Sequence, residues 1–148
     1  MTQEDKNLLP QDLCARLPYG VKVAIEYSKD KYTKVYDLKE IDNDTTSELR
    51  QYVTVWDYGF YSSVISYPLI DCRPYLRSMS SMTEEEKKEL YKLLLDIERL
   101  SFADIIYNGK DTISPTYDWL LKNHFDYRGL IPMGLAIEAP EGMYVYNN

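Results

Sequence analysis

The segment from Thr83 to Leu100 constrains the fold most strongly, because it specifies one well-defined amphipathic helix. Thr83-Glu-Glu-Glu86 is a capping box, in which the threonine hydroxyl accepts from the Glu86 amide and the Glu86 side chain reaches back. The three acidic residues also suit the positive end of a helix dipole. Apolar residues then recur at helical spacing, at Leu90, Leu93, Leu94, Ile97 and Leu100. We expect this apolar face to pack on a sheet.

The residues that would form the sheet precede this helix. Strand-like alternation covers residues 21–27 and 49–56, and β-prone residues fill 32–41 and 60–70. A polar turn at 28–31 predicts that the first two strands form a hairpin, and a loop follows at 42–47. Pro68 marks an edge strand or the end of a strand.

Shorter helices are predicted near the two ends of the chain. Leu9–Leu17 places Pro10 in the first turn and ends at Pro18 and Gly20, while a second helix runs from Ser114 to about Asn123. From residue 124 onward, glycine and proline interrupt regular structure, and the apolar tail 130–143 is expected to lie against the body. The order of segments predicts an α+β fold with a small antiparallel sheet of about three to four strands, packed against one long and one or two short helices.

Length and composition favour a single globular domain over residues 1–148. A chain of 148 residues with 45% hydrophobic residues can build a core without disulfides or a metal. The two cysteines, Cys14 and Cys72, are expected to be small buried apolar residues. With one histidine and no Cys-x-x-Cys pair, the sequence indicates no metal site and no cofactor. The polar N-terminus lacks the apolar stretch of an export signal, and no membrane span is visible, so we expect a cytoplasmic protein.

Charge and tyrosine content bear on the partners. The net charge of −7 counts against non-specific nucleic-acid binding, although residues 16–39 are locally basic and include Lys29, Lys31 and Lys34. The chain holds 15 tyrosines, too many to bury every hydroxyl. Two interpretations remain open: a half-exposed sheet face, or a protein interface that includes Tyr58, Tyr61 and Tyr67.

Catalytic motifs of the common types are absent from the sequence. In His124-Phe-Asp-Tyr-Arg-Gly129, an extended backbone would place His124, Asp126 and Arg128 on one side, where a carboxylate could raise the basicity of the imidazole. Alternatively, Asp126 and Arg128 pair with each other and hold the loop.

The second candidate site consists of Arg73 and Arg77, which precede the capped helix. Two guanidinium groups near a helix start could bind an anion such as phosphate or a carboxylate. The alternative is that they form ion pairs with the nearby acidic residues Glu84 to Glu86.

Four stretches of the sequence are distinctive enough to suggest a family. They are Leu13-Cys-Ala-Arg-Leu-Pro-Tyr-Gly-Val-Lys-Val23 and the ranges 73–86, 118–131 and 134–144. In these stretches the chain resembles a family of small uncharacterised proteins encoded by gut bacteria and by their phages and prophages, while residues 28–70 match least. The resemblance implies a mobile-element setting in a bacterial host cell and carries no activity with it.

Three functions follow as hypotheses. The leading one is a non-enzymatic accessory protein of phage or mobile-element origin that binds another protein. The second is a nucleic-acid-associated accessory protein that uses the basic hairpin, by which we mean the predicted hairpin with Lys29, Lys31 and Lys34. The third is a small enzyme built on His124 and Asp126.

Overall fold

A computed structural model describes residues 2–26, 34–43, 51–58, 63–98 and 114–144. Within these ranges the chain is α+β, with three α-helices and a six-stranded sheet that is mostly antiparallel. The helices are α1 (Gln3–Arg16), α2 (Glu84–Glu98) and α4 (Ser114–Lys122). The strands are β1 (Lys22–Ile25), β2 (Lys34–Asn43), β3 (Gln51–Asp57), β4 (Ser63–Pro68), β5 (Cys72–Leu76) and β6 (Ile137–Glu138).

The sheet is larger than the predicted three to four strands. Its order is β4-β3-β2-β1-β5-β6, and every neighbouring pair is antiparallel except β5 with β6. The predicted hairpin of the first two strands is present as β1 and β2, and β4 is an edge strand that ends at Pro68, as the sequence indicated. The additional strands are β5 and β6. β5 contains Pro74, which pairs opposite Val23, so a residue that usually excludes a strand lies inside one here.

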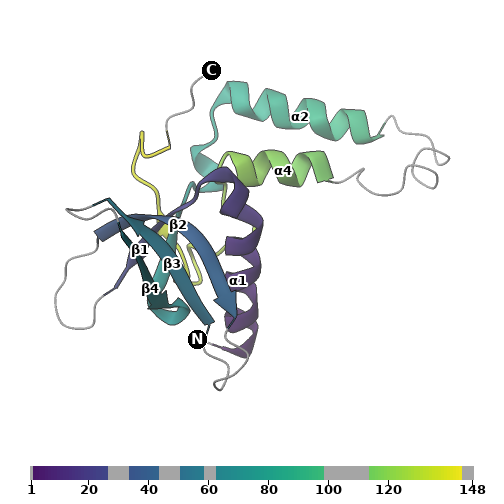
Figure 1. Ribbon diagram of the computed structural model, residues 1–148. Coiled ribbons are helices and arrows are strands. Elements are labelled where there is room, and N and C mark those ends of the chain that lie inside the picture. The colour runs from purple at the N-terminus through teal and green to yellow at the C-terminus, as the bar shows by residue number, and fades with distance from the viewer. Residues whose placement is uncertain (1, 27–33, 44–50, 59–62, 99–113, 145–148) are drawn as a thin grey trace.

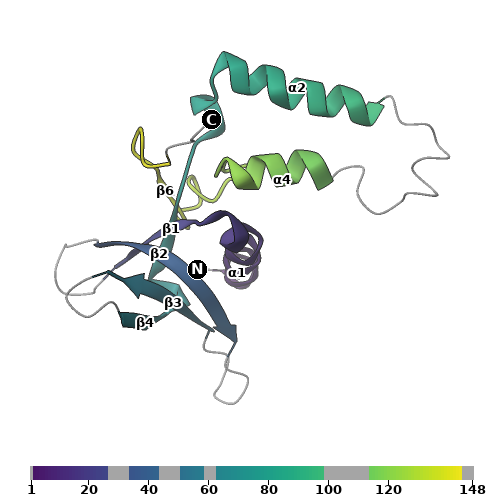
Figure 2. The same cartoon turned by 45° about the horizontal axis from the view of Figure 1, so that its top comes forward.

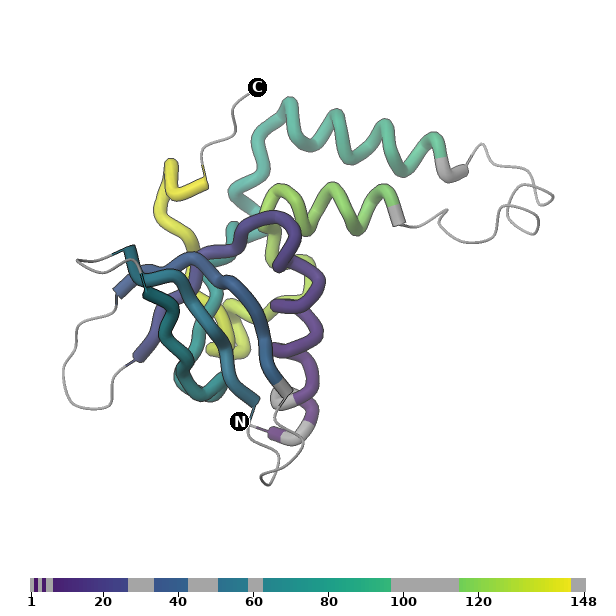
Figure 3. Tube along the Cα trace, in the orientation of Figure 1, coloured from purple at the N-terminus to yellow at the C-terminus, as the bar shows by residue number. Residues whose placement is uncertain are grey.

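Helix α1 covers one face of the sheet, as the tubes in Figure 3 and the ribbons in Figure 1 show. Leu9 and Leu13 of α1 are buried in the main core together with apolar residues of β1, β2 and β3. The predicted start of this helix at Leu9 is wrong, because α1 begins at Gln3 and contains Pro10 in its interior. The burial of Leu9 and Leu13 stabilises the helix on both sides of the proline, and this packing offsets the missing backbone hydrogen bond.

The main core occupies the face of the sheet that α1 covers. Val53 and Val55 of β3 point into it and are buried. On the opposite face of β3, Thr54 is also buried, whereas Trp56 is exposed. The opposite face, called the outer face below, has no described helix against it in either view of the ribbon (Figures 1 and 2).

Helix α2 packs against α4 and not on the sheet. The two helices lie side by side and extend away from the strands (Figures 1 and 2). Leu90 of α2 and Trp119 of α4 border a second core cluster, made of Met82, Leu120 and Phe125. The predicted apolar face of α2 therefore has α4 as its neighbour, and Leu94 remains 44% exposed. The side chains of Ile97 and Leu100 lie outside the described part, as do those of Tyr27 and Leu49 and most of the predicted loop at 42–47.

The capping box at the start of α2 is formed as predicted. The Glu86 amide donates to Thr83 Oγ1 over 3.2 Å, and the Thr83 amide donates to a Glu86 carboxylate oxygen over 2.9 Å. The tail also lies against the body as expected, since Leu130, Leu135 and Ala136 form a buried cluster with Leu76 of β5.

Candidate functional site

His124 lies in the turn that follows α4 and is buried. Its backbone has a φ of 59°, a left-handed conformation that a non-glycine residue seldom adopts. The imidazole is 3% exposed and stacks on the Tyr144 ring, with 3.7 Å between ring centroids. Its Nδ1 has no hydrogen-bond partner among the described residues.

Burial, and to a smaller extent the positive charges of Arg16, Arg77 and Lys22, together lower the pKa of His124 from the ordinary 6.5 to about 4. The imidazole is therefore neutral at neutral pH. A base with so low a pKa takes up a proton weakly, and the stacked tyrosine covers one side of the ring.

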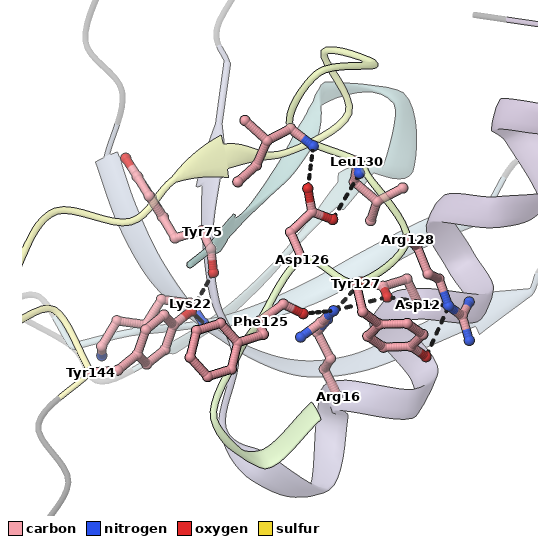
Figure 4. A network of polar contacts seen from close by, with 11 residues as sticks. Asp12, Arg16, Lys22, Tyr75, Phe125, Asp126, Tyr127, Arg128, Leu130 and Tyr144 are labelled. Atoms are coloured by element: carbon pink, nitrogen blue, oxygen red, sulfur yellow. Dashed lines mark hydrogen bonds and ion pairs between the residues drawn. The ribbon is translucent and has the colours of Figure 1, made fainter. Parts of the chain in front are cut away.

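Asp126, two residues after His124, is also buried, and its carboxylate accepts hydrogen bonds from backbone amides of its own loop. Its two carboxylate oxygens accept from the amides of Leu130 and Ile131 over 2.7 and 2.9 Å (Figure 4). His124 is not among the described hydrogen-bond partners of this carboxylate. His124, Tyr127 and Arg128 lie in turns on either side of a single parallel β-bridge from Phe125 to Arg77. The segment is therefore not a continuous extended strand, and the predicted one-sided row of His124, Asp126 and Arg128 does not form.

Arg128 joins a buried ionic cluster that links the loop to α1. Its Nε lies 3.7 Å from Asp12 Oδ1 and donates to the Tyr127 hydroxyl over 3.0 Å. The alternative expectation of an Asp126–Arg128 pair is wrong, because Asp126 is occupied by backbone amides and Arg128 turns toward Asp12.

The centre of this cluster is the ion pair of Asp12 and Arg16, one turn apart on α1. Both side chains have 0% exposure, and Arg16 donates to the two Asp12 oxygens over 2.7 and 3.2 Å. Arg16 also donates to the Phe125 carbonyl over 2.8 Å, which ties α1 to the loop (Figure 4). Sequence reasoning missed this pair. The spacing of four residues signals a helical ion pair, but nothing in it signals burial.

Tyr144 closes the same region from the C-terminal side. Its hydroxyl donates to the Tyr75 carbonyl over 2.7 Å and accepts from the Lys22 amide over 3.0 Å (Figure 4). Together with the stack on His124, these bonds fasten the tail to β1 and β5. The contacts among these described residues position structural elements and do not present a reacting pair to solvent.

Arg73 and Arg77 bind different partners and do not form one anion site. Arg77 forms a two-pronged ion pair with Glu86, with both N–O distances at 2.8 Å. This is the alternative expectation for Arg77, and the hydrogen bonds from Arg77 lower the pKa of Glu86. Arg73 donates to the carbonyls of Ile70 and Cys72 and lies 3.9 Å from a Glu26 oxygen.

Only one of the two cysteines is buried, although the sequence predicted that both would be. Cys72 is buried, and desolvation raises the pKa of its thiol to about 12, so it is not a thiolate nucleophile at neutral pH. Cys14 is exposed on α1. No group of three or more His, Cys, Asp or Glu side chains in the described ranges could hold a metal ion.

The tyrosines predicted to form one patch lie on opposite faces of the sheet. Tyr58 is 70% exposed and stacks on Trp56, with 6.4 Å between ring centroids. Tyr67 pairs opposite the buried Val53, on the core side, and its hydroxyl lies 3.3 Å from that of Tyr36. Tyr61 lies outside the described residues, as do Lys29 and Lys31.

Lys34, the described member of the basic hairpin, is engaged by its neighbours. Its Nζ lies 3.0 Å from an Asp57 oxygen and 5.0 Å from the centroid of the Tyr36 ring. The lysine therefore offers little uncompensated charge to a phosphate backbone.

The outer face of the sheet carries a group of exposed apolar side chains on three adjacent strands. Trp56 of β3 pairs opposite Val64 of β4, and Asp37 of β2, two residues after Val35, pairs opposite Trp56. Val35, Trp56, Tyr58 and Val64 are 43%, 38%, 70% and 44% exposed. We call these four residues the outer-face patch. A register irregularity in β2 accompanies Lys39, whose Nζ lies over the Trp56 ring at 5.0 Å.

Compared with protein-family models, with curated proteins and with solved structures, the chain gives no match. Within the described ranges, no helix combines the length and the apolar character needed to cross a bilayer.

Proposed function

We propose that the protein is a non-enzymatic accessory protein of phage or mobile-element origin, and that it works by binding another protein through the outer-face patch. The observation that carries this proposal is the exposure of Trp56, Tyr58, Val35 and Val64 on neighbouring strands of a sheet whose other face is covered by α1. A contiguous set of exposed large apolar residues on a folded domain is typical of an interaction site.

The composition of the patch also suits a protein partner. Tryptophan and tyrosine are enriched at protein interfaces and account for many of the residues that dominate binding energy. Trp56 is positioned by the Tyr58 ring and by Lys39, so its indole is held in place before a partner arrives. Less side-chain entropy is then lost on binding.

The catalytic hypothesis receives less support from the same geometry. A buried imidazole with a pKa of about 4 and a carboxylate that accepts from two backbone amides are the features of a structural loop. The nucleic-acid hypothesis depends on lysines of which the described one is already paired with Asp57.

The test is a tagged pull-down from bacterial cytoplasmic extract, with and without nuclease, read by mass spectrometry. Wild type should capture one stoichiometric protein that survives nuclease, and Trp56→Ala should lose it. The matched control is Tyr91→Ala, which removes a 63% exposed aromatic residue from α2 and should leave capture unchanged.

Urea unfolding of each variant separates lost binding from lost folding. Capture that survives Trp56→Ala but disappears with Tyr91→Ala would transfer the interface to α2 and overturn the proposal. Bands that vanish on nuclease treatment would favour nucleic acid instead.

A further inference from the structure

Strand β4 forms one edge of the sheet, and no described strand pairs with its outer side. An edge strand presents unpaired backbone N–H and C=O groups, which can pair with another chain. The direction of these groups in β4 can be worked out from its register with β3.

Pro68 determines which residues of β4 bond to β3. It lies opposite Tyr52 and has no N–H, so this pair cannot exchange two hydrogen bonds and is a non-hydrogen-bonded pair. The two kinds of pair alternate along an antiparallel ladder, and the pair of Thr54 with Ser66 is therefore of the same kind. The hydroxyls of Thr54 and Ser66 lie 3.0 Å apart, which fits the closer side chains of such pairs. It follows that Val64 and Ser66 direct their N–H and C=O groups outward, toward the free edge.

The sequence of β4 leaves this edge unprotected. Natural edge strands commonly carry lysine, an internal proline or a bulge that prevents pairing with another chain. Ser63-Val-Ile-Ser-Tyr-Pro68 holds no charged residue, its proline is the last residue, and its register with β3 is continuous. Asp57, opposite Ser63, is neutralised by Lys34.

We propose that β4 pairs antiparallel with β4 of a second copy of this chain, about a two-fold axis at Ile65. Val64 of one copy then lies opposite Ser66 of the other, and the same pairing recurs on the other side of the axis. The N–H and C=O groups of Val64 and Ser66, four in each copy, all find partners. The two Ile65 side chains meet at the axis on the core side, where the partly buried Ile65 pairs opposite Val55.

The charge distribution favours contact between two copies at β4 over contact at other parts of the surface. Two chains with a net charge of −7 repel each other, so their contact is favoured where acidic side chains are few. Pairing at β4 brings no charged residue of either strand opposite another. It also joins the two sheets so that their outer faces lie on the same side, which leaves both outer-face patches accessible. The dimer is thus independent of the function proposed above.

The test is sedimentation velocity of the purified chain from about 1 to 200 µM, with Ser66→Pro and its matched control Ser66→Ala. Both variants lose the hydroxyl bond to Thr54, but the proline alone removes an outward N–H. Wild type and Ser66→Ala should form a saturable dimer with similar dissociation constants. Ser66→Pro should raise the constant about tenfold or more, because the dimer loses two backbone hydrogen bonds and gains two ring clashes.

Hydrogen exchange on wild type gives a readout that needs no variant. The amides of Val64 and Ser66 should exchange more slowly at high than at low protein concentration. A wild type that stays monomeric over the whole range, or a dimer that Ser66→Pro leaves unchanged, would overturn the proposal. Trp56→Ala should dimerise normally, and a dimer lost in that variant would place the interface on the outer face and also overturn the proposal.

Discussion

The burial of His124 makes the stability of the fold depend on pH in a window that can be calculated. The pKa is about 4 in the fold, against the ordinary 6.5 that applies to an unfolded chain. Above pH 6.5 the imidazole is neutral in both states and costs nothing. Below it the unfolded state binds a proton that the folded state rejects, so stability falls as the pH falls, until the folded state also titrates near pH 4.

The magnitude follows from the two pKa values. Between pH 7 and pH 5, the linkage relation gives a loss of about 2 kcal/mol in the free energy of unfolding. This window lies above the range in which most carboxylates titrate, so the histidine should dominate the change.

The assay is urea unfolding at pH 7, 6 and 5, followed by tryptophan fluorescence, for wild type and His124→Asn. Asparagine tolerates the positive φ of position 124 but does not titrate. The variant should be less stable at every pH because it loses the stack on Tyr144, and its stability should change little between pH 7 and pH 5. As the chain has one histidine, its NMR titration is unambiguous and should give a midpoint near 4. Equal pH slopes for the two proteins, or an NMR midpoint near 6.5, would refute the reasoning.

Three further predictions concern the buried ion pair, the helix cap and the two thiols. Asp12→Ala leaves the buried Arg16 without its carboxylate and should lower the urea-derived free energy of unfolding by about 3–5 kcal/mol. The double variant Asp12→Leu, Arg16→Met leaves no unpaired buried charge and should lose less. Equal losses in the two variants would contradict a cost of burying the unpaired Arg16 charge. Thr83→Ala should cost about 1 kcal/mol by urea unfolding and Thr83→Ser almost nothing, and a serine variant as unstable as the alanine one would argue against the cap. Under native conditions iodoacetamide should alkylate Cys14, and it should alkylate Cys72 only after urea unfolds the chain. Peptide mass spectrometry measures both reactions, and labelling of Cys72 in the folded protein would contradict its burial.

Local patterns in the sequence predicted the elements whose geometry depends on neighbouring residues. The capping box at Thr83 specifies its own hydrogen bonds within one helical turn, and they form as expected. Alternation of apolar residues likewise identified β1 and β3, and β-prone residues identified β2 and β4, because each of these strands has apolar residues on the core.

Features that depend on distant parts of the chain were not predictable in this way. β5 contains Pro74 and an arginine, so it reads as a break, and it becomes a strand because β1 on one side and β6 on the other supply its pairing. The apolar face of α2 does not indicate whether a sheet or a helix will cover it. The burial of Asp12 and Arg16 depends on the carbonyl of Phe125, which no local pattern could reveal.

The bond from Arg16 to the Phe125 carbonyl spans 109 positions of the chain, and this separation has a consequence during synthesis on the ribosome. When α1 emerges, this backbone acceptor of the buried Arg16 guanidinium has not yet been translated. At about 5–20 residues per second, roughly 5 to 20 seconds pass before the acceptor is available. Throughout that time water must solvate the Arg16 guanidinium. The nascent N-terminal helix can therefore make this bond only after Phe125 has left the exit tunnel.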